Sequence, residues 1–416
     1  MAFRGDYNGA VAALDELLGV DDPHAQPDNF DHDRALILLE RAMLHQASAD
    51  LEGSRDDLLV ADKQLELLDF TNTAATDIAR YFYSDSASPY KISPIERLSL
   101  NALNILNYLA VGDLSGARVE AKRFTVMRKF LQDTDPDHAH GAIGSYLAGF
   151  VHEQLGEYGP ALRYYDEALD EGQLPGLERA VVRLAERDSY RGRNVKKLLG
   201  SGIAPAMDGG GEILIVAGIG RVPFKVPKRM PIGAAIGLLN ADFTGDLDVL
   251  ARSAFKVLIF PELVPALGTY KSAHARVDGE RVAMDRVTNL GAELVREYEQ
   301  VKPKIIAAAV TRLISRAVVA EGAREAGREI AGNSGGAAVA GVLASFVAES
   351  VLVAADKPDT RSWTLLPEQV LVSRTRVSAG THEVEVGLGE ATTGAQQFTV
   401  DVPEGGYALI VLMPLH

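Results

Sequence analysis

The sequence predicts a multidomain protein of the α and α+β class. An irregular α-solenoid is expected over residues 1–199, followed by a β-rich α+β domain over residues 205–416 that contains a long inserted Gly/Ala-rich helix. Two observations favour this class. A turn-and-helix spacing recurs through the first half of the chain, and short apolar runs of strand length fill much of the second half. The Gly- and Pro-containing stretch around residues 200–211 is typical of a linker.

The composition excludes several classes of function. The chain has 416 residues, of which 47% are hydrophobic and 24% charged, and this is a globular composition with length for two or three domains. The net charge of −15 argues against a general nucleic-acid binder, because such a protein needs a basic face. The absence of cysteine excludes disulfides, thiolate metal sites and a cysteine nucleophile.

The clearest repeat copy covers residues 149–168, GFVHEQLGEYGPALRYYDEA. Its small and aromatic residues follow the tetratricopeptide spacing, in which two helices cross closely after a tight turn. These residues are Gly149, Gly156, Tyr158, Ala161, Tyr165 and Ala168. We expect a neighbouring helix to approach Gly149 closely and the ring of Tyr165 to fill the gap to the next repeat.

Further copies are expected at residues 5–17 and 95–130, and residues 33–69 carry two amphipathic helices. The expected turn glycines are Gly5, Gly53, Gly112 and Gly156. Their spacing exceeds the usual repeat of about 34 residues, so the repeats should be irregular and contain insertions.

One insertion, residues 81–94, contains aromatic, Ser and Pro residues that cannot continue a helix. It is either a functional loop or a packed connection whose tyrosines fill a gap between repeats. Stacked helix pairs form concave surfaces that bind peptides or helices, and aromatic anchors dominate protein interfaces. The candidate binding residues of the repeat concavity are Tyr81, Tyr83, Tyr90, Tyr108 and Tyr158.

The second half is expected to start with strands over residues 212–219 and 255–260 and with a hairpin around Asp278-Gly279. The segment GIGRVP, residues 218–223, superficially suggests a phosphate-binding loop. Prolines follow it instead of a helix, so an extended strand with a bend is the better interpretation.

Residues 288–355 return to a helical period. Arg312 and Arg316 belong to an arginine stripe, and Gly336 and Gly341 belong to a run of small residues. Each helical Gly costs about 1 kcal/mol relative to Ala, so such a run is favoured where a second backbone comes close. We expect an assembly helix that contacts another copy or a membrane, and packing within the same chain is the alternative.

Residues 361–416 show period-two alternation with glycines at the turns, which predicts a small antiparallel sheet or sandwich. The strands of residues 212–287 are expected to pair with these later strands, because helices inserted between two strand groups commonly pack on a shared sheet. Trp363 is expected in the core.

The chain contains no G-x-S-x-G, Walker or H-E-x-x-H motif. An enzyme of unknown reaction would have to use Asp359 and Arg361 or the DTDPDHAH segment, residues 133–140. An Arg held by an Asp is more commonly a structural pin, and the acidic segment lacks the Gly and bidentate Glu of a calcium loop. The sequence therefore favours a non-enzymatic scaffold without a metal or cofactor, with other proteins or its own copies as partners.

Two longer segments carry a family resemblance. The segment SPIERLSLNALNILNYLAVGDLSGARVEAKRF, with Glu96, Arg97, Gly112, Asp113, Ala117, Glu120 and Arg123, resembles a family of poorly characterised bacterial tetratricopeptide-containing proteins, many of them predicted envelope lipoproteins. VAADKPDTRSWTLLPEQVLVSRTRVSAGTHEVEV resembles the same family's closing module. The resemblance implies a cell-envelope location, with the cytoplasm as the alternative. The sequence lacks a lipoprotein signal and its cysteine, and a start within a repeat would fit removal of a leader.

Overall fold

The computed structural model describes residues 1–29, 33–65, 90–138, 140–170, 172–207, 209–239, 257–331, 358–389 and 394–415. The described helices are η1 (Ala2–Arg4), α1 (Tyr7–Leu18), α2 (Arg34–Ala47), α3 (Leu51–Gln64), α5 (Pro94–Ala110), α6 (Leu114–Thr134), α7 (Ala142–Gln154), α8 (Tyr158–Ala168), α9 (Pro175–Ala185), α10 (Arg193–Leu199), α11 (Ile232–Ile236) and α13 (Leu290–Ala331). The described strands are β1 (Gly211–Ile219), β2 (Phe224–Pro231), β3 (Val257–Val264), β4 (Ala273–Val277), β5 (Glu280–Val282), β6 (Asp285–Asn289), β7 (Gln369–Val377), β8 (Gly380–Leu388), β9 (Gln396–Val402) and β10 (Tyr407–Leu412). Helices and mixed sheets confirm the α and α+β class.

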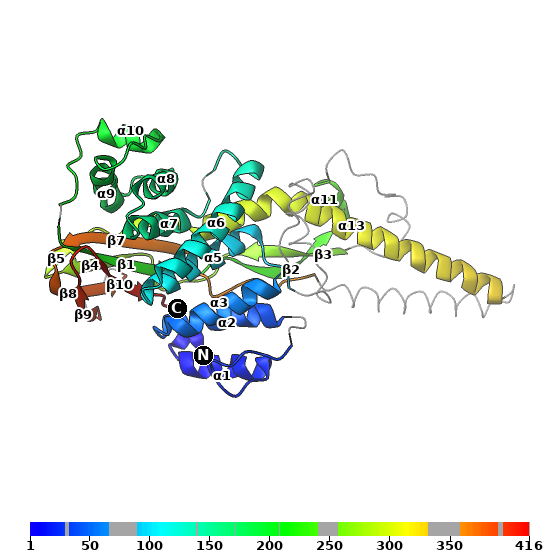
Figure 1. Ribbon diagram of the computed structural model, residues 1–416. Coiled ribbons are helices and arrows are strands. Elements are labelled where there is room, and N and C mark those ends of the chain that lie inside the picture. The colour runs from blue at the N-terminus through cyan, green and yellow to red at the C-terminus, as the bar shows by residue number, and fades with distance from the viewer. Residues whose placement is uncertain are drawn as a thin grey trace.

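The helices of the first half pack in sequential pairs, α2 with α3, α5 with α6, α7 with α8 and α9 with α10 (Figure 1). The turn between α5 and α6 shows how such a pair forms. Gly112 has a φ of 75°, a left-handed conformation that favours glycine, and the side chain of Asp113 then accepts a hydrogen bond from Gly116 N over 2.9 Å. This aspartate cap starts α6 immediately after the turn.

The same turn recurs at three other places, and one predicted turn glycine was assigned wrongly. Gly5 and Gly156 have φ values of 77° and 72°, as expected for left-handed turn positions. In the α2–α3 turn this position is held by Ala49, with a φ of 62°, whereas Gly53 lies inside α3. Gly53 corresponds to Gly116, because its N–H is the one that Asp50 caps over 3.0 Å.

Gly149 is approached as closely as the sequence predicts. A Cβ built on Gly149 would lie 2.5 Å from Cδ1 of the Tyr165 ring, a separation that real side chains do not reach. Gly144 stands in the same relation to Phe124, at 2.1 Å from its ring. Glycine at these positions lets α7 pack directly against aromatic rings of α8 and α6.

The strands form two four-stranded sheets and one ribbon. The first sheet has the order β10-β1-β7-β6, the second β5-β4-β8-β9, and β2 pairs with β3. Strands before α13 therefore pair with strands after it, as predicted. The predicted purely antiparallel module was wrong in one respect, because β10 joins β1 in parallel. The hairpin at Asp278 and Gly279 is confirmed, and their φ values of 50° and 80° fit a type I′ turn.

The first sheet lies between the helices and the second sheet, so this part of the molecule has three layers (Figure 1). Alternate residues of β1 point to opposite faces. Leu214 and Val216 belong to the core shared with the helices, whereas Ile213 and Ile215 belong to the core between the two sheets. Apolar contact is thus continuous from the helical half to the sheets, and the division into two domains near residue 200 stays a prediction.

The inner helices α5 and α7 are buried almost completely, because α5 contacts β10 and α13, and α7 contacts β6. The face of the helical row that a free solenoid would offer to a partner is therefore covered by the chain's own sheet. Trp363 is fully buried, as expected.

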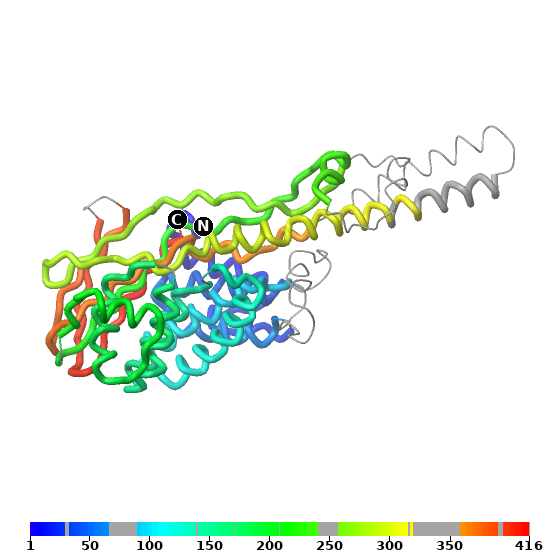
Figure 2. The backbone as a smooth tube through the Cα atoms, turned by 90° about the horizontal axis from the view of Figure 1, so that it is seen from above, coloured from blue at the N-terminus to red at the C-terminus, as the bar shows by residue number. Residues whose placement is uncertain are grey.

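Helix α13 leaves the body of the molecule as a long arm, with the β2–β3 ribbon running beside it (Figure 2). It has 42 residues, which corresponds to about 63 Å. It begins at Leu290, close to the start of the helical region predicted over residues 288–355, and Gly336 and Gly341 lie outside the described residues. One face of α13 is apolar and packed on the body. The buried apolar residues among its described side chains are Leu290, Leu294, Tyr298, Val301, Ile305, Ile306, Ala309, Val310, Leu313 and Ala317.

Candidate functional site

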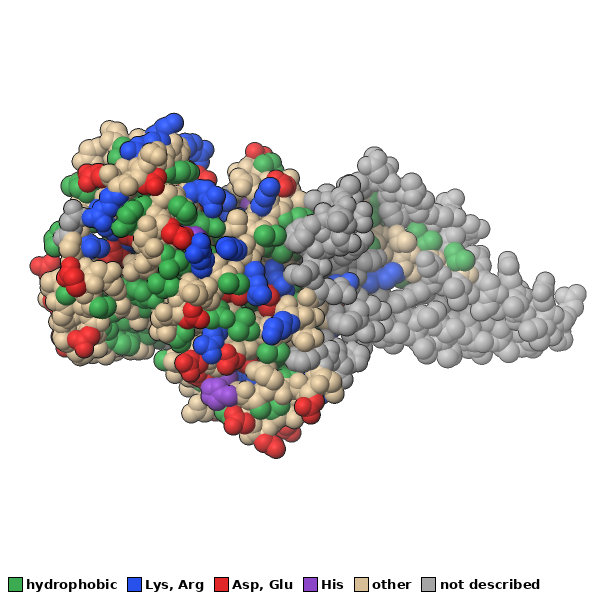
Figure 3. All heavy atoms as spheres, in the orientation of Figure 1, with side chains coloured by type: hydrophobic (Ala, Val, Ile, Leu, Met, Phe, Trp, Pro, Cys, Tyr) green, Lys and Arg blue, Asp and Glu red, His purple; other side chains and the backbone are tan. Residues whose placement is uncertain are grey.

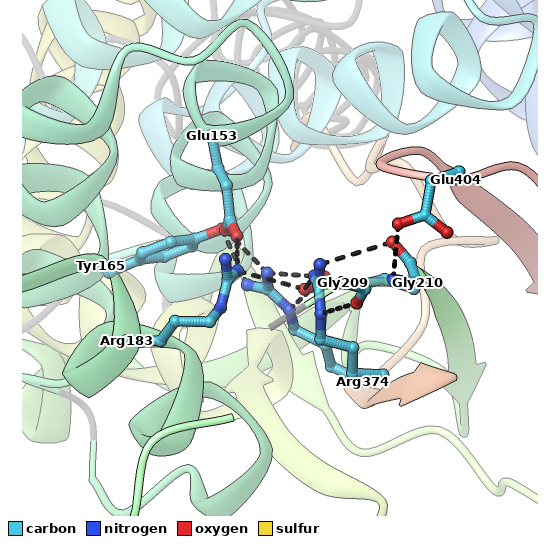
Figure 4. A network of polar contacts seen from close by, with 9 residues as sticks. Glu153, Tyr165, Arg183, Gly209, Gly210, Arg374 and Glu404 are labelled. Carbon is cyan, nitrogen blue, oxygen red and sulfur yellow. Dashed lines mark hydrogen bonds and ion pairs between the residues drawn. The ribbon is translucent and has the colours of Figure 1, made fainter. Parts of the chain in front are cut away.

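A buried ionic network lies where the helices meet the first sheet (Figure 4). Glu153 from α7 accepts from Arg183 Nη2 on α9 over 2.5 Å and from Arg374 Nη2 on β7 over 2.7 Å. Glu212 at the start of β1 accepts from Arg374 Nε over 2.6 Å. The hydroxyl of Tyr165 donates to Glu153 over 2.6 Å and accepts from Arg374 Nη1 over 2.9 Å. One polar network thus joins five elements, α7, α8, α9, β1 and β7.

Ion pairing outweighs burial in setting the protonation of this network. Burial would by itself raise the pKa of Glu153, but Arg374 and Arg183 together hold the pKa of this carboxyl below its ordinary value. Burial would lower the pKa of Arg374, but Glu153 and Glu212 hold it well above its ordinary value. Both groups therefore stay charged inside the protein, and Arg374 also lies over the rings of Phe150 and Tyr165 at 5.2 and 5.6 Å.

A cavity of about 350 Å³ adjoins this network. Its charged lining residues are Arg179, Glu212, Arg374 and Arg376. Arg376 donates from Nη1 to Glu212 over 3.0 Å and from Nε to Gly209 O over 2.8 Å. The volume lies within the range of small-molecule sites.

Asp359 and Arg361, the predicted catalytic candidates, form a structural pin. Arg361 donates through its backbone N, Nε and Nη2 to the carboxylate of Asp359, at 3.0, 2.8 and 2.7 Å, and through Nη1 to Asp33. Lys225 on β2 donates to the carbonyl of Arg361 over 3.0 Å. These bonds hold the segment 358–366, here called the strap, which leads into β7.

Carboxylates from the helices hold the strap from the other side. Glu96 on α5 accepts from Trp363 N over 2.9 Å. Glu40 on α2 accepts from Thr364 N over 2.7 Å and from Leu365 N over 3.0 Å. Burial raises the pKa of Glu40 to about 7, with a smaller contribution from nearby Glu96. The arrangement explains why a polar DTRSW sequence precedes a buried strand.

Glu297 of α13 is a further buried carboxyl at this junction. It accepts from Ile95 N at the start of α5 over 3.2 Å. Burial, together with the charge of Glu96, raises its pKa to about 8. Glu96 itself completes a capping box with Ser93, so three glutamates meet around the first turn of α5 and the strap.

The segment 133–140 is also used structurally. His138 Nδ1 lies 2.8 Å from Asp135 Oδ1, and His140 Nε2 lies 3.1 Å from the Asp135 carbonyl. Arg296 of α13 approaches the same carboxylate at 3.7 Å. Burial would by itself raise the pKa of Asp135, but His138 lowers it below its ordinary value. Among the described residues no group of His, Asp and Glu has the arrangement of a metal site.

The predicted binding tyrosines do not form one surface in the described part of the chain. Tyr90 is buried, and its hydroxyl donates to Glu96 over 2.8 Å. Tyr108 and Tyr158 are half-buried under the guanidinium groups of Arg55 and Arg187.

The remaining predicted site residues fall mostly outside the described part. Tyr81, Tyr83 and the side chain of Arg316 are not among the described residues, and Arg312 is half-buried on α13. None of the described helices has the length and apolar character that crossing a membrane requires. The assembly role of the helix therefore stays a prediction.

Sequence reasoning missed the ionic network. The available signals were Glu212 at the head of an apolar strand and the alternation of Arg374 and Arg376 in LVSRTRV, which places both on one face of β7. Comparison of the chain with protein-family models, with curated proteins and with solved structures gives no match. The function is therefore argued from the chain's own residues.

Proposed function

We propose that the protein is a non-enzymatic scaffold or assembly component whose helical half is a tetratricopeptide-like solenoid that binds other proteins or its own copies. Four left-handed turns, each followed at once by a new helix, support the repeat assignment. The glycine–aromatic approach at Gly149 supports it as well. Both candidate sites for chemistry are engaged in holding the fold, which favours a scaffold over an enzyme.

The observation that carries the proposal is an exposed stripe on α6. Val119 and Val126 are 50% and 58% exposed, although large apolar side chains are usually buried. They lie seven residues apart, on one face of the helix, and alternate with exposed Lys122 and Lys129. Figure 3 shows Lys and Arg side chains gathered over the helical face that is in view. An acidic, amphipathic protein segment is the partner that such a stripe fits.

This position differs from the expected concavity, since the sheet covers the inner face of α5 and α7. The outer helix α6 remains as a repeat surface for partners, since α8 is packed against α7, α9 and α10. The proposal places the protein in the cell envelope, as the family resemblance implies. It also includes contact with a membrane.

The test compares the full chain with Val119→Glu/Val126→Glu by chemical cross-linking and quantitative mass spectrometry in the native cell. The expected result is specific loss of the cross-linked partners. The matched control is Leu267→Glu, which places a charge at an exposed leucine between β3 and β4, outside α6 and α13. Equal sets of partners for the wild type and the stripe variant would remove the basis of the α6 proposal.

Assembly through the long helix is tested separately. Light scattering after size exclusion should show an oligomer that depends on protein concentration. Alternatively, flotation with anionic liposomes should show lipid binding. Gly341→Leu should reduce it without unfolding the repeats. A protein that stays monomeric at high concentration and does not bind the liposomes would refute the assembly role of the long helix.

A further inference from the structure

The cavity beside the ionic network lies between α9, the connection from β5 to β6, and β7. Most of its lining is apolar. The apolar residues are Pro175, Ala180, Ala206, Met207, Val282 and Ala283. The hydrogen bond from Ala206 N to Arg179 O, 3.1 Å long, holds the segment before β1 against α9 and so forms one wall.

The charges around the cavity do not balance. Three lining arginines, Arg179, Arg374 and Arg376, face one lining carboxylate, Glu212, so two formal positive charges remain. Behind them, Glu153 and Arg183 cancel each other. The side chains that line the cavity therefore carry a net positive charge, although the whole chain is acidic and Asp285 lies beside the lining residue Gly176.

Among the lining arginines, Arg179 has donors that remain for a ligand. Within the described ranges, the exposed Arg179 guanidinium forms no hydrogen bond or ion pair. In contrast, Arg374 and Arg376 use their donors on Glu153, Glu212 and backbone carbonyls.

We propose that this cavity binds a small organic carboxylate, whose charged group pairs with Arg179 and whose apolar body lies against Ala180, Met207 and Val282. A guanidinium matches the two oxygens of a carboxylate in plane. The apolar wall adds affinity for a ligand with a short hydrocarbon body, and Glu212 disfavours a doubly charged anion. This inference goes beyond the proposed protein-binding role and does not depend on it.

The test uses three probes on the full chain: octanoate, octanol and inorganic phosphate. Calorimetry and thermal unfolding should show that octanoate binds and raises Tm, that octanol binds much more weakly, and that phosphate does not compete. Arg179→Ala should weaken octanoate binding by about tenfold, which corresponds to about 1.4 kcal/mol for one charge-assisted contact. Arg179 is exposed, so this variant should fold normally.

Two further variants define the site. Ala283→Leu fills the cavity from an exposed lining position and should abolish octanoate binding while every arginine stays. Lys196→Ala removes an exposed cation from α10 and should leave binding unchanged. Equal binding of octanol and octanoate, stronger binding of phosphate, or unchanged affinity in Arg179→Ala would each overturn the proposal.

Discussion

Arg374 on β7 donates to Glu153 on α7 over 2.7 Å, and this ion pair joins residues 221 positions apart in the chain. Both side chains are almost inaccessible to solvent, at 2% and 5% exposed. A buried pair is costly to form, but it is far more costly to break, because the remaining charge has no water around it. The network thus fixes how the helices sit on the sheet.

The first prediction follows from this relationship. Arg374→Met leaves Glu153 and Glu212 with fewer cations, so the free energy of unfolding should fall by about 3–5 kcal/mol. Urea denaturation measures this free energy of unfolding. The control, Arg193→Met, breaks an ion pair with Asp170 whose Arg is 80% exposed, and should cost less than about 1 kcal/mol. Similar losses in both variants would contradict a special role for the buried network.

Gly149→Ala should destabilise the protein, although Gly→Ala inside a helix usually stabilises by up to about 1 kcal/mol. The added Cβ would meet the ring of Tyr165, which cannot move away because its hydroxyl is bound to Glu153 and Arg374. A loss of about 1–3 kcal/mol is expected.

Gly233→Ala provides the matched control for that substitution. It lies in α11 with open space around the position of a Cβ. Thermal unfolding should show a lower Tm for Gly149→Ala and an unchanged or higher Tm for Gly233→Ala. A raised Tm in both variants would mean that α7 and the ring of Tyr165 can move apart without loss of stability.

Stability should decrease between about pH 5 and pH 8 because of Glu297. Burial raises its folded-state pKa from 4.5 to about 8, so the unfolded chain releases this proton first as the pH rises. The contribution is complete below about pH 4.5 and is lost as the pH passes through about 8. Glu297→Gln should reduce the fall in unfolding free energy from pH 5 to pH 8 by up to about 4 kcal/mol.

Urea titrations at several pH values measure this difference. Glu299→Gln removes an exposed carboxyl from the same helix and controls for the loss of one negative charge. Glu40, half-buried at the strap, has a pKa raised by burial to about 7 and adds a dependence of the same sign. A pH profile of Glu297→Gln that is parallel to the wild type would exclude a titrating role for Glu297.

Asp359→Asn should loosen the strap. Arg361 then loses a charged acceptor for three of its donors, and the free energy of unfolding should fall by about 1–3 kcal/mol. Limited proteolysis should show faster cleavage between residues 358 and 366. A substrate screen that finds an activity lost in this variant, with stability unchanged, would favour the enzyme alternative.

Local features of the fold were predictable from the sequence, and contacts between distant residues were not. Helix starts follow from Asp113 after Gly112 and from Ser93 before Pro94, because caps and turns are set by near neighbours. The hairpin at Asp278-Gly279 follows for the same reason. The parallel pairing of β10 with β1 and the meeting of Glu153 with Arg374 depend on how whole elements pack, which no local pattern encodes.

The tyrosines illustrate the same limit at the candidate site. Spacing places Tyr165 correctly on an inner helical face, but it does not show that the chain's own sheet covers the inner face of α5 and α7. Tyr90 therefore serves the cap of α5 instead of a partner.

The covered inner face has a consequence for synthesis. Helix α5 leaves the ribosome with its apolar face bare, and strand β10, which covers part of this face, is made roughly 15–60 s later at about 5–20 residues per second. Such long-range pairing also folds slowly. The nascent chain thus carries an uncovered apolar helix face for tens of seconds, and such a face is the kind of surface that chaperones bind.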